Sequence, residues 1–129
     1  MSQKNITQKL LIRDSYRVLI ANCPPDYQAR MGRLPTGAKI FIDSASKPFD
    51  LIQIFVSSRN QLVEQLPKMK QLLKQDGLLW TTCPKGKAEI NRDSIRIYAQ
   101  TIGLQVVSLI AIDETWSALR LKIVPAETT

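Results

Sequence analysis

The stretch that decides the fold is residues 49–83, FDLIQIFVSSRNQLVEQLPKMKQLLKQDGLLWTTC. It contains a mostly apolar run at 51–56, LIQIFV, which is typical of a strand buried on both faces. Apolar residues then recur at helical spacing between positions 62 and 73, and a second strand-like run follows at 78–83. The order strand, helix, strand predicts two parallel strands joined by a right-handed crossover.

Pro67 falls inside the expected helix. A proline in a helix interior costs about 3 kcal/mol, because it removes one backbone donor and its ring clashes with the preceding turn. The sequence therefore predicts a kink or break near Leu66 in a helix that ends before Gly77.

Outward from this stretch, short strand-like runs alternate with helix-like ones, and 119–123 alternates apolar with basic residues. The tight connection at 114–117 makes this last run an antiparallel partner of 105–113. The prediction is a single α/β domain over 1–129, a mostly parallel Rossmann-like sheet of about six strands with helices on both faces and a C-terminal antiparallel hairpin. The other expected elements are a short helix at the N-terminus around Ile6, Leu10 and Leu11, strands at 16–22 and 38–43, and helices at 26–32 and 91–102.

Composition excludes several classes of function. The 129 residues include no histidine, so Ser-His and Cys-His nucleophile pairs and histidine-zinc sites are excluded. Cys23 and Cys83 match no C-x-x-C spacing, and neither a metal nor a redox site is predicted. No apolar run is long enough for a signal peptide or a membrane span, and we expect a soluble, cytoplasmic protein with no membrane partner.

The formal net charge of +7 makes weak attraction to nucleic acid plausible. The basic residues are scattered, with most of the excess in the N-terminal third, and aromatic residues do not interleave with them. Specific recognition of nucleic acid is therefore not expected.

The path from FDLIQIF through two helices to the final hairpin resembles strands four to seven of the class I methyltransferase-like fold. As the resemblance implies, methyltransferases with this fold have a glycine-rich turn after the first strand, where the backbone approaches S-adenosylmethionine. Here the turn is Asn22-Cys23-Pro24-Pro25-Asp26, which has no glycine, and no cofactor is predicted. Asp43 stands where such enzymes keep an acidic residue for ribose, but the general polarity of loops favours a solvated strand-end aspartate.

A closer resemblance rests on three short motifs together with FDLIQIFVSSR. They are Gly77-Leu78-Leu79-Trp80, Pro84-Lys85-Gly86 and the segment DETWSALR at 113–120. These resemble a family of bacterial proteins known as a domain of unknown function. The resemblance implies a compact methyltransferase-like domain and carries no activity with it.

Ligands of open α/β sheets bind outside the carboxyl ends of the strands. Polar and aromatic residues follow the expected strands there, and they suit a small anionic or nucleotide-like ligand. The alternative is that helix caps and turns are polar anyway, with the carboxylates at 113 and 114 paired to Arg59 or Lys85. The candidate ligand-binding residues are Asn22, Ser58, Arg59, Lys85, Asp113, Glu114 and Trp116, and no catalytic residue is predicted.

The stretch between Asp43 and Pro48 is too short for the strand and helices that the full fold has there. The segment Ala38 to Asp43 is therefore expected to form a bare sheet edge, through which the chain could form a homodimer. The alternative is that the N-terminal segment or the Ser44 to Pro48 loop folds over this edge. The leading interpretation is a non-catalytic module that acts through a protein partner or its own dimer. The alternatives are an enzyme or sensor for a small anionic ligand at the strand ends, and a basic nucleic-acid accessory protein.

Overall fold

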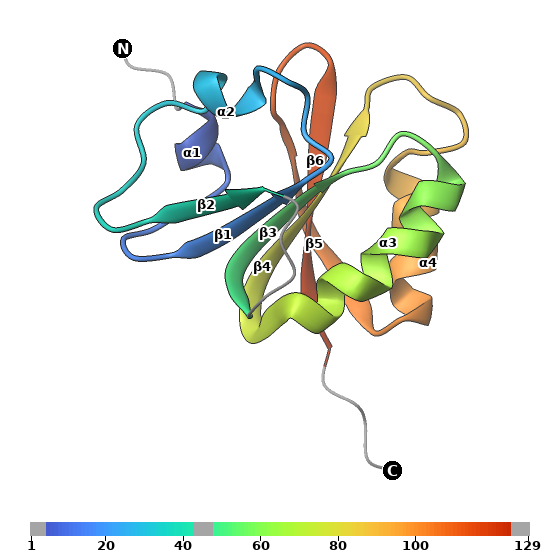
Figure 1. Cartoon of the computed structure of the whole chain (residues 1–129). Coiled ribbons are helices and arrows are strands. Elements are labelled where there is room, and N and C mark those ends of the chain that lie inside the picture. Colours follow the sequence, from blue (N-terminus) through green and yellow to red (C-terminus); the bar gives the residue numbers. More distant parts are fainter. Residues whose placement is uncertain (1–4, 43–47, 125–129) are drawn as a thin grey trace.

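The computed structural model describes residues 5–42 and 48–124. Its six strands form one sheet in the order β2-β1-β3-β4-β6-β5, in which β6 runs in the opposite direction to the other five strands (Figure 1). The mostly parallel sheet with a C-terminal antiparallel hairpin is confirmed. The elements are α1 (Ile6–Lys9), β1 (Arg17–Ala21), α2 (Tyr27–Arg30), β2 (Lys39–Ile42), β3 (Phe49–Phe55), α3 (Arg59–Leu72), β4 (Leu73–Pro84), α4 (Arg92–Thr101), β5 (Leu104–Ala111) and β6 (Trp116–Ile123).

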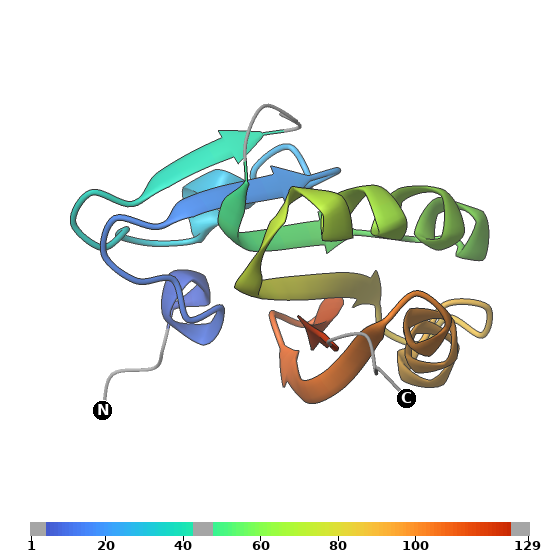
Figure 2. The same ribbon diagram turned by 90° about the horizontal axis from the view of Figure 1, so that it is seen from below.

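Helices cover both faces of the sheet, as the sequence predicts. The longer helices α3 and α4 lie on one side and α1 on the other, which is clearest in the view along the sheet (Figure 2). Leu62 and Leu66 of α3 and Ile95 of α4 are fully buried against the first face. On the second face Tyr27 of α2 and Trp80 of β4 lie in a separate apolar cluster.

The N-terminal segment is tied to the far half of the sheet. The indole N–H of Trp80 donates a hydrogen bond of 2.9 Å to the carbonyl oxygen of Leu10. The ammonium group of Lys9 donates to the carbonyl oxygens of Ala111 and Ile112, at 3.2 and 3.3 Å. The chain thus crosses under β4 and reaches the end of β5 before it enters β1. In the described part of the chain, no helix is long and apolar enough to cross a membrane.

β2 is the last strand on its side of the sheet within the described residues. It pairs in parallel with β1 through residues 39–42, and Ile42 is 42% exposed. The predicted edge strand is therefore present. Asp43, the candidate partner of a ribose, lies outside the described residues.

The helix α3 differs from its prediction at two points. It runs unbroken through Pro67, so the predicted break is wrong. It also ends at Leu72 and leaves out Leu73, which the predicted helical stripe included, because Leu73 is extended and pairs with Phe49 as the first residue of β4. The apolar side chain at position 73 therefore belongs to a strand, although it continues the helical spacing of α3.

Candidate functional site

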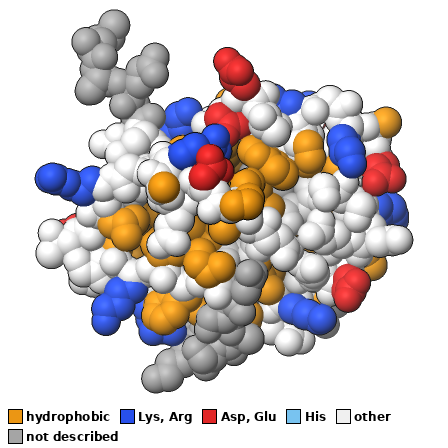
Figure 3. Space-filling view, turned by 45° about the horizontal axis from the view of Figure 1, so that its top comes forward, with side chains coloured by type: hydrophobic (Ala, Val, Ile, Leu, Met, Phe, Trp, Pro, Cys, Tyr) orange, Lys and Arg blue, Asp and Glu red, His pale blue; other side chains and the backbone are white. Residues whose placement is uncertain are grey.

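The carboxyl ends of β1, β3, β4 and β5 lie at one end of the sheet, which we call the rim. Figure 3 is tilted to bring this end forward, and it shows apolar side chains in the middle with charged side chains around them. All seven candidate ligand-binding residues are predicted from the sequence to lie at the rim. The structure gives each of them a defined position.

Asn22 follows β1 with a φ of 63°, in the left-handed region that asparagine tolerates better than most residues. Its side-chain amide donates a hydrogen bond to the carbonyl oxygen of Phe55, at 3.3 Å, and another to the side-chain oxygen of Gln65. Asn22 thus ties the end of β1 to the end of β3 and to α3. The amide group predicted to meet a ligand is used for contacts within the protein.

Asp113 forms an ion pair with Arg30 of α2, with a distance of 2.8 Å between Oδ2 and the guanidinium nitrogen. Its other oxygen accepts hydrogen bonds from the backbone amides of Thr115 and Trp116, at 2.8 and 2.9 Å. Burial alone would raise the pKa of Asp113, but these amides and the guanidinium group lower it below its ordinary value of 3.8. Its expected pairing with Arg59 or Lys85 is wrong.

Arg30 was missed by the sequence analysis because it lies 83 positions from Asp113. The only signal was a basic residue near the end of a short helix, and that signal is common. Glu114, the neighbour of Asp113, is exposed and makes no ion pair with the described residues. The two adjacent carboxylates are therefore not a pair that acts together.

Trp116 packs edge-on against Phe55, with ring centroids 4.9 Å apart and an angle of 88° between the rings. Phe55 meets Tyr27 in the same manner at 4.7 Å and 78°. This aromatic row joins β6, β3 and α2 on the face that α1 and α2 cover. The indole of Trp116 is half-buried in it, so only part of the ring can meet a ligand.

Ser58 caps α3, since its hydroxyl oxygen accepts a hydrogen bond of 3.1 Å from the backbone amide of Gln61. Arg59, the first residue of α3, is exposed, and its guanidinium group has no partner among the described residues. Helix capping explains why a serine stands at position 58 without any ligand. The exposed guanidinium group of Arg59 can still contact a ligand.

Lys85 is exposed and lies on the other side of the sheet from the aromatic row. It lines a pocket of about 200 Å³ with Arg92, Ser117 and Leu109. Leu119, which belongs to the apolar cluster under α3 and α4, forms part of the same wall. The rim residues therefore fall into two groups on opposite faces, with Trp116 in one and Lys85 in the other.

Below the rim lies a buried row of polar side chains that the sequence analysis did not single out. The hydroxyl group of Tyr27 donates to the side-chain oxygen of Gln53 at 2.8 Å, and the amide of Gln53 donates to the hydroxyl oxygen of Thr82 at 3.0 Å. Burial raises the pKa of Tyr27 far above its usual range, although the hydrogen bond to Gln53 opposes this shift. The glutamine within LIQIFV was the signal, because a polar residue inside a buried strand needs a partner.

Among the described residues, no group of three or more cysteine, aspartate and glutamate side chains is placed to hold a metal ion.

No protein-family model and no curated protein sequence matches the chain. Solved structures do match it. DhpI in its complex with SAH has a TM-score of 0.63 at 8% identity, over 94% of this chain and 84% of that chain. A TehB-like SAM-dependent methyltransferase from Corynebacterium glutamicum has a TM-score of 0.60 at 12% identity, over 95% and 89% of the two chains.

TrmN from Thermus thermophilus also has a TM-score of 0.60, at 10% identity over 92% of this chain. The match covers 47% of TrmN, so the present chain spans about half of its length. At these identities the similarity shows the fold alone. The chain has the Rossmann-like α/β fold of SAM-dependent methyltransferases.

The turn after β1 does not fit the cofactor that this fold implies. Pro24 and Pro25 carry no backbone N–H, and the carbonyl oxygen of Pro24 accepts a hydrogen bond of 3.1 Å from Tyr27 at the start of α2. Asn22 has the backbone conformation of a glycine, but its side chain extends onto β3 and α3. The turn therefore carries a side chain where a glycine-rich turn has none, and it lacks two of the backbone donors that such a turn could offer.

Proposed function

We propose that this chain is a non-catalytic methyltransferase-like module that acts through self-association or a protein partner, within the bacterial family that its motifs resemble. The observation that carries the proposal is the side chain of Asn22, whose amide bonds to Phe55 and Gln65 across the strand ends. These bonds fix a side chain at a turn where a cofactor-binding glycine has none. A cofactor seated against this turn would gain no N–H donor from Pro24 or Pro25.

Calorimetric titration with S-adenosylmethionine and S-adenosylhomocysteine tests the first half of the proposal. We expect binding to be millimolar or weaker. A cooperative unfolding transition in the same sample shows that the protein is folded. Micromolar binding of either compound would contradict the proposal.

The edge of β2 supports the second half. β2 pairs with β1 on one side, and in the described residues no strand pairs with its other side. Phe41 is half-buried and Ile42 is exposed on a strand whose one charged residue is Lys39. An unpaired strand with apolar side chains is a surface that proteins usually cover or pair. We propose that a second copy pairs with the Ala38 to Asp43 edge to form a dimer.

Light scattering coupled to size exclusion tests this dimer. The substitution Ile42→Lys should convert the dimer to a monomer, because it places a charge on the pairing edge. Ile97→Lys is the matched control, since Ile97 is 57% exposed on α4 and should not affect the association. A monomer at the highest soluble concentration, or equal effects of the two variants, would contradict the β2 interface.

A second candidate function is the binding of a small anionic or nucleotide-like ligand at the rim. The pocket beside Lys85 and Arg92 favours it, as does the exposed Arg59. A thermal-shift screen with pyrophosphate and adenosine monophosphate tests it, and saturating ligand should raise the melting midpoint by roughly 10 °C. Lys85→Ala or Arg59→Ala should abolish the shift with little change in the unliganded midpoint, because an exposed charge contributes little to stability. No shift with either probe would remove this candidate.

A further inference from the structure

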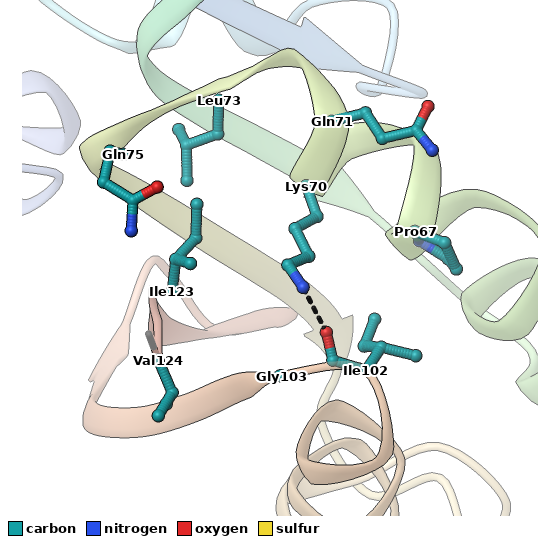
Figure 4. Close-up of a pocket in the computed structure, with 9 residues that line it drawn as sticks. All are labelled: Pro67, Lys70, Gln71, Leu73, Gln75, Ile102, Gly103, Ile123 and Val124. Carbon is teal, nitrogen blue, oxygen red and sulfur yellow. Dashed lines mark hydrogen bonds between the residues drawn. The ribbon is translucent and has the colours of Figure 1, made fainter. Parts of the chain in front are cut away.

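A large cavity lies at the end of the sheet opposite the rim. It has a volume of about 710 Å³ and opens between the ends of α3 and α4, next to the start of β5 and the end of β6 (Figure 4). This volume falls in the range of small-molecule sites. The proposed function uses the rim and the β2 edge, so the cavity is a separate feature.

Lys70 of α3 provides a fixed positive charge in this cavity. Its ammonium group donates a hydrogen bond of 2.6 Å to the carbonyl oxygen of Ile102, the residue that ends α4. An ammonium group has three N–H donors, and this bond uses one of them. A cation at a helix C-terminus is also electrostatically favourable. Lys70 is therefore held in place with donors left for a ligand.

Gly103 leaves the room that this ammonium group needs. Its φ is +79°, and a Cβ atom built there would lie 2.9 Å from Nζ of Lys70. Any larger residue would press on the lysine side chain from the cavity wall. The glycine thus serves both the turn after α4 and the open space beside Lys70.

The rest of the lining combines one amide with apolar side chains. In Figure 4 the carboxamide of Gln75 turns toward the cavity, whereas Gln71 points away from it. Leu73 and Ile123 point toward one another and form an apolar wall, which the exposed side chain of Val124 continues. A cation and an amide donor at one side of an apolar wall are suited to an amphipathic anion.

We propose that this cavity binds a small carboxylate with an apolar body. The carboxylate accepts hydrogen bonds from the ammonium group of Lys70 and the amide of Gln75, and the apolar body packs against Leu73, Ile123 and Val124. One lysine matches the single charge of a carboxylate, whereas phosphate recognition typically uses arginine or several cations. The net charge of +7 favours the approach of an anion.

The test uses the full chain with octanoate as the probe and octanol as its neutral counterpart. In a titration followed by amide NMR signals, octanoate should move the signals of Lys70, Gly103 and Val124. Octanol should bind at least about tenfold more weakly, since it lacks the charge that Lys70 recognises. Lys70→Met should weaken octanoate binding by at least about tenfold. Lys68→Met is the matched control, because Lys68 is exposed on the same helix and does not line the cavity.

A second variant separates binding from stability, since Lys70→Met also removes the hydrogen bond to Ile102. Val124→Trp places a large side chain in the cavity and leaves Lys70 intact, and it should abolish octanoate binding. Equal binding of octanoate and octanol, wild-type affinity in either cavity variant, or no movement of these three signals would overturn the proposal. None of these results bears on cofactor binding or on the dimer, which are tested separately.

Discussion

The hydroxyl group of Tyr98 donates a hydrogen bond of 3.1 Å to the carbonyl oxygen of Val63. This carbonyl lies four residues before Pro67, whose ring nitrogen has no hydrogen to donate to it. Tyr98 of α4 thus supplies the donor that the proline lacks. The bond explains how α3 can continue through Pro67 to Leu72, and it links the two long helices.

Replacing Tyr98 with phenylalanine should lower the free energy of unfolding by about 0.5–1.5 kcal/mol, because the Val63 carbonyl loses its protein donor. In a Pro67→Ala background the same replacement should cost less, since residue 67 then donates to Val63 itself. Urea unfolding of the four proteins measures this coupling. An equal cost in both backgrounds would show that Tyr98 does not compensate for the proline.

Thr81 and Thr82 are both fully buried, but they face opposite sides of β4. The hydroxyl group of Thr81 has no hydrogen-bond partner among the described residues, whereas that of Thr82 accepts from Gln53. Thr81→Val should therefore stabilise the protein by about 1 kcal/mol, and Thr82→Val should destabilise it by about 1–3 kcal/mol. Denaturant unfolding measures the change in the free energy of unfolding of each variant. Two changes of the same sign would contradict the different hydrogen bonding of Thr81 and Thr82.

Asp113 should make stability depend on pH. Its pKa is lowered in the folded protein, so its stabilising contribution is present above its unfolded pKa of about 4 and is lost as the pH falls through the folded value. The Asp113→Asn variant should have a lower free energy of unfolding than the wild type, and this difference should be largest at neutral pH. The difference should shrink as the pH falls below about 4.

This difference isolates Asp113 because Asp50, whose pKa is also lowered, is present in both proteins. Urea unfolding between neutral pH and about pH 2 gives the profile. A difference that does not change with pH would mean that the charge of Asp113 does not contribute to stability.

The bond from Trp80 to Leu10 should hold the N-terminal segment in place. Trp80→Phe should cost about 2–4 kcal/mol, because a buried side chain becomes smaller and the Leu10 carbonyl loses its donor. Hydrogen exchange should accelerate more in α1 than in β3. Trp116→Phe is the control, since the half-buried Trp116 indole has no hydrogen-bond partner among the described residues, and it should leave α1 unaffected.

Much of the sheet could be predicted because local patterns determine it. The mostly apolar run at 51–56 belongs to a central parallel strand, and the alternation at 119–123 belongs to the antiparallel one. The helix predicted at 91–102 is also present, and Asn91 caps it as a capping box. These features depend on neighbours in the sequence.

The errors arose where distant residues decide the structure. The start of β4 at Leu73 depends on its pairing with Phe49, and the survival of α3 at Pro67 depends on Tyr98. At the rim, the ion pair of Asp113 depends on Arg30, from another part of the chain. Such partners have no fixed spacing, so a single sequence does not reveal them.

During translation Lys9 and Leu10 emerge well before the residues that they contact. Lys9 bonds to the carbonyl oxygens of Ala111 and Ile112, and Leu10 bonds to Trp80. Until those residues have been synthesised, Leu10 and the apolar side chains on this face of β1 and β3 have no complete cover. Until β5 is complete, the nascent chain therefore presents an apolar surface of the kind that favours misassembly and that molecular chaperones bind.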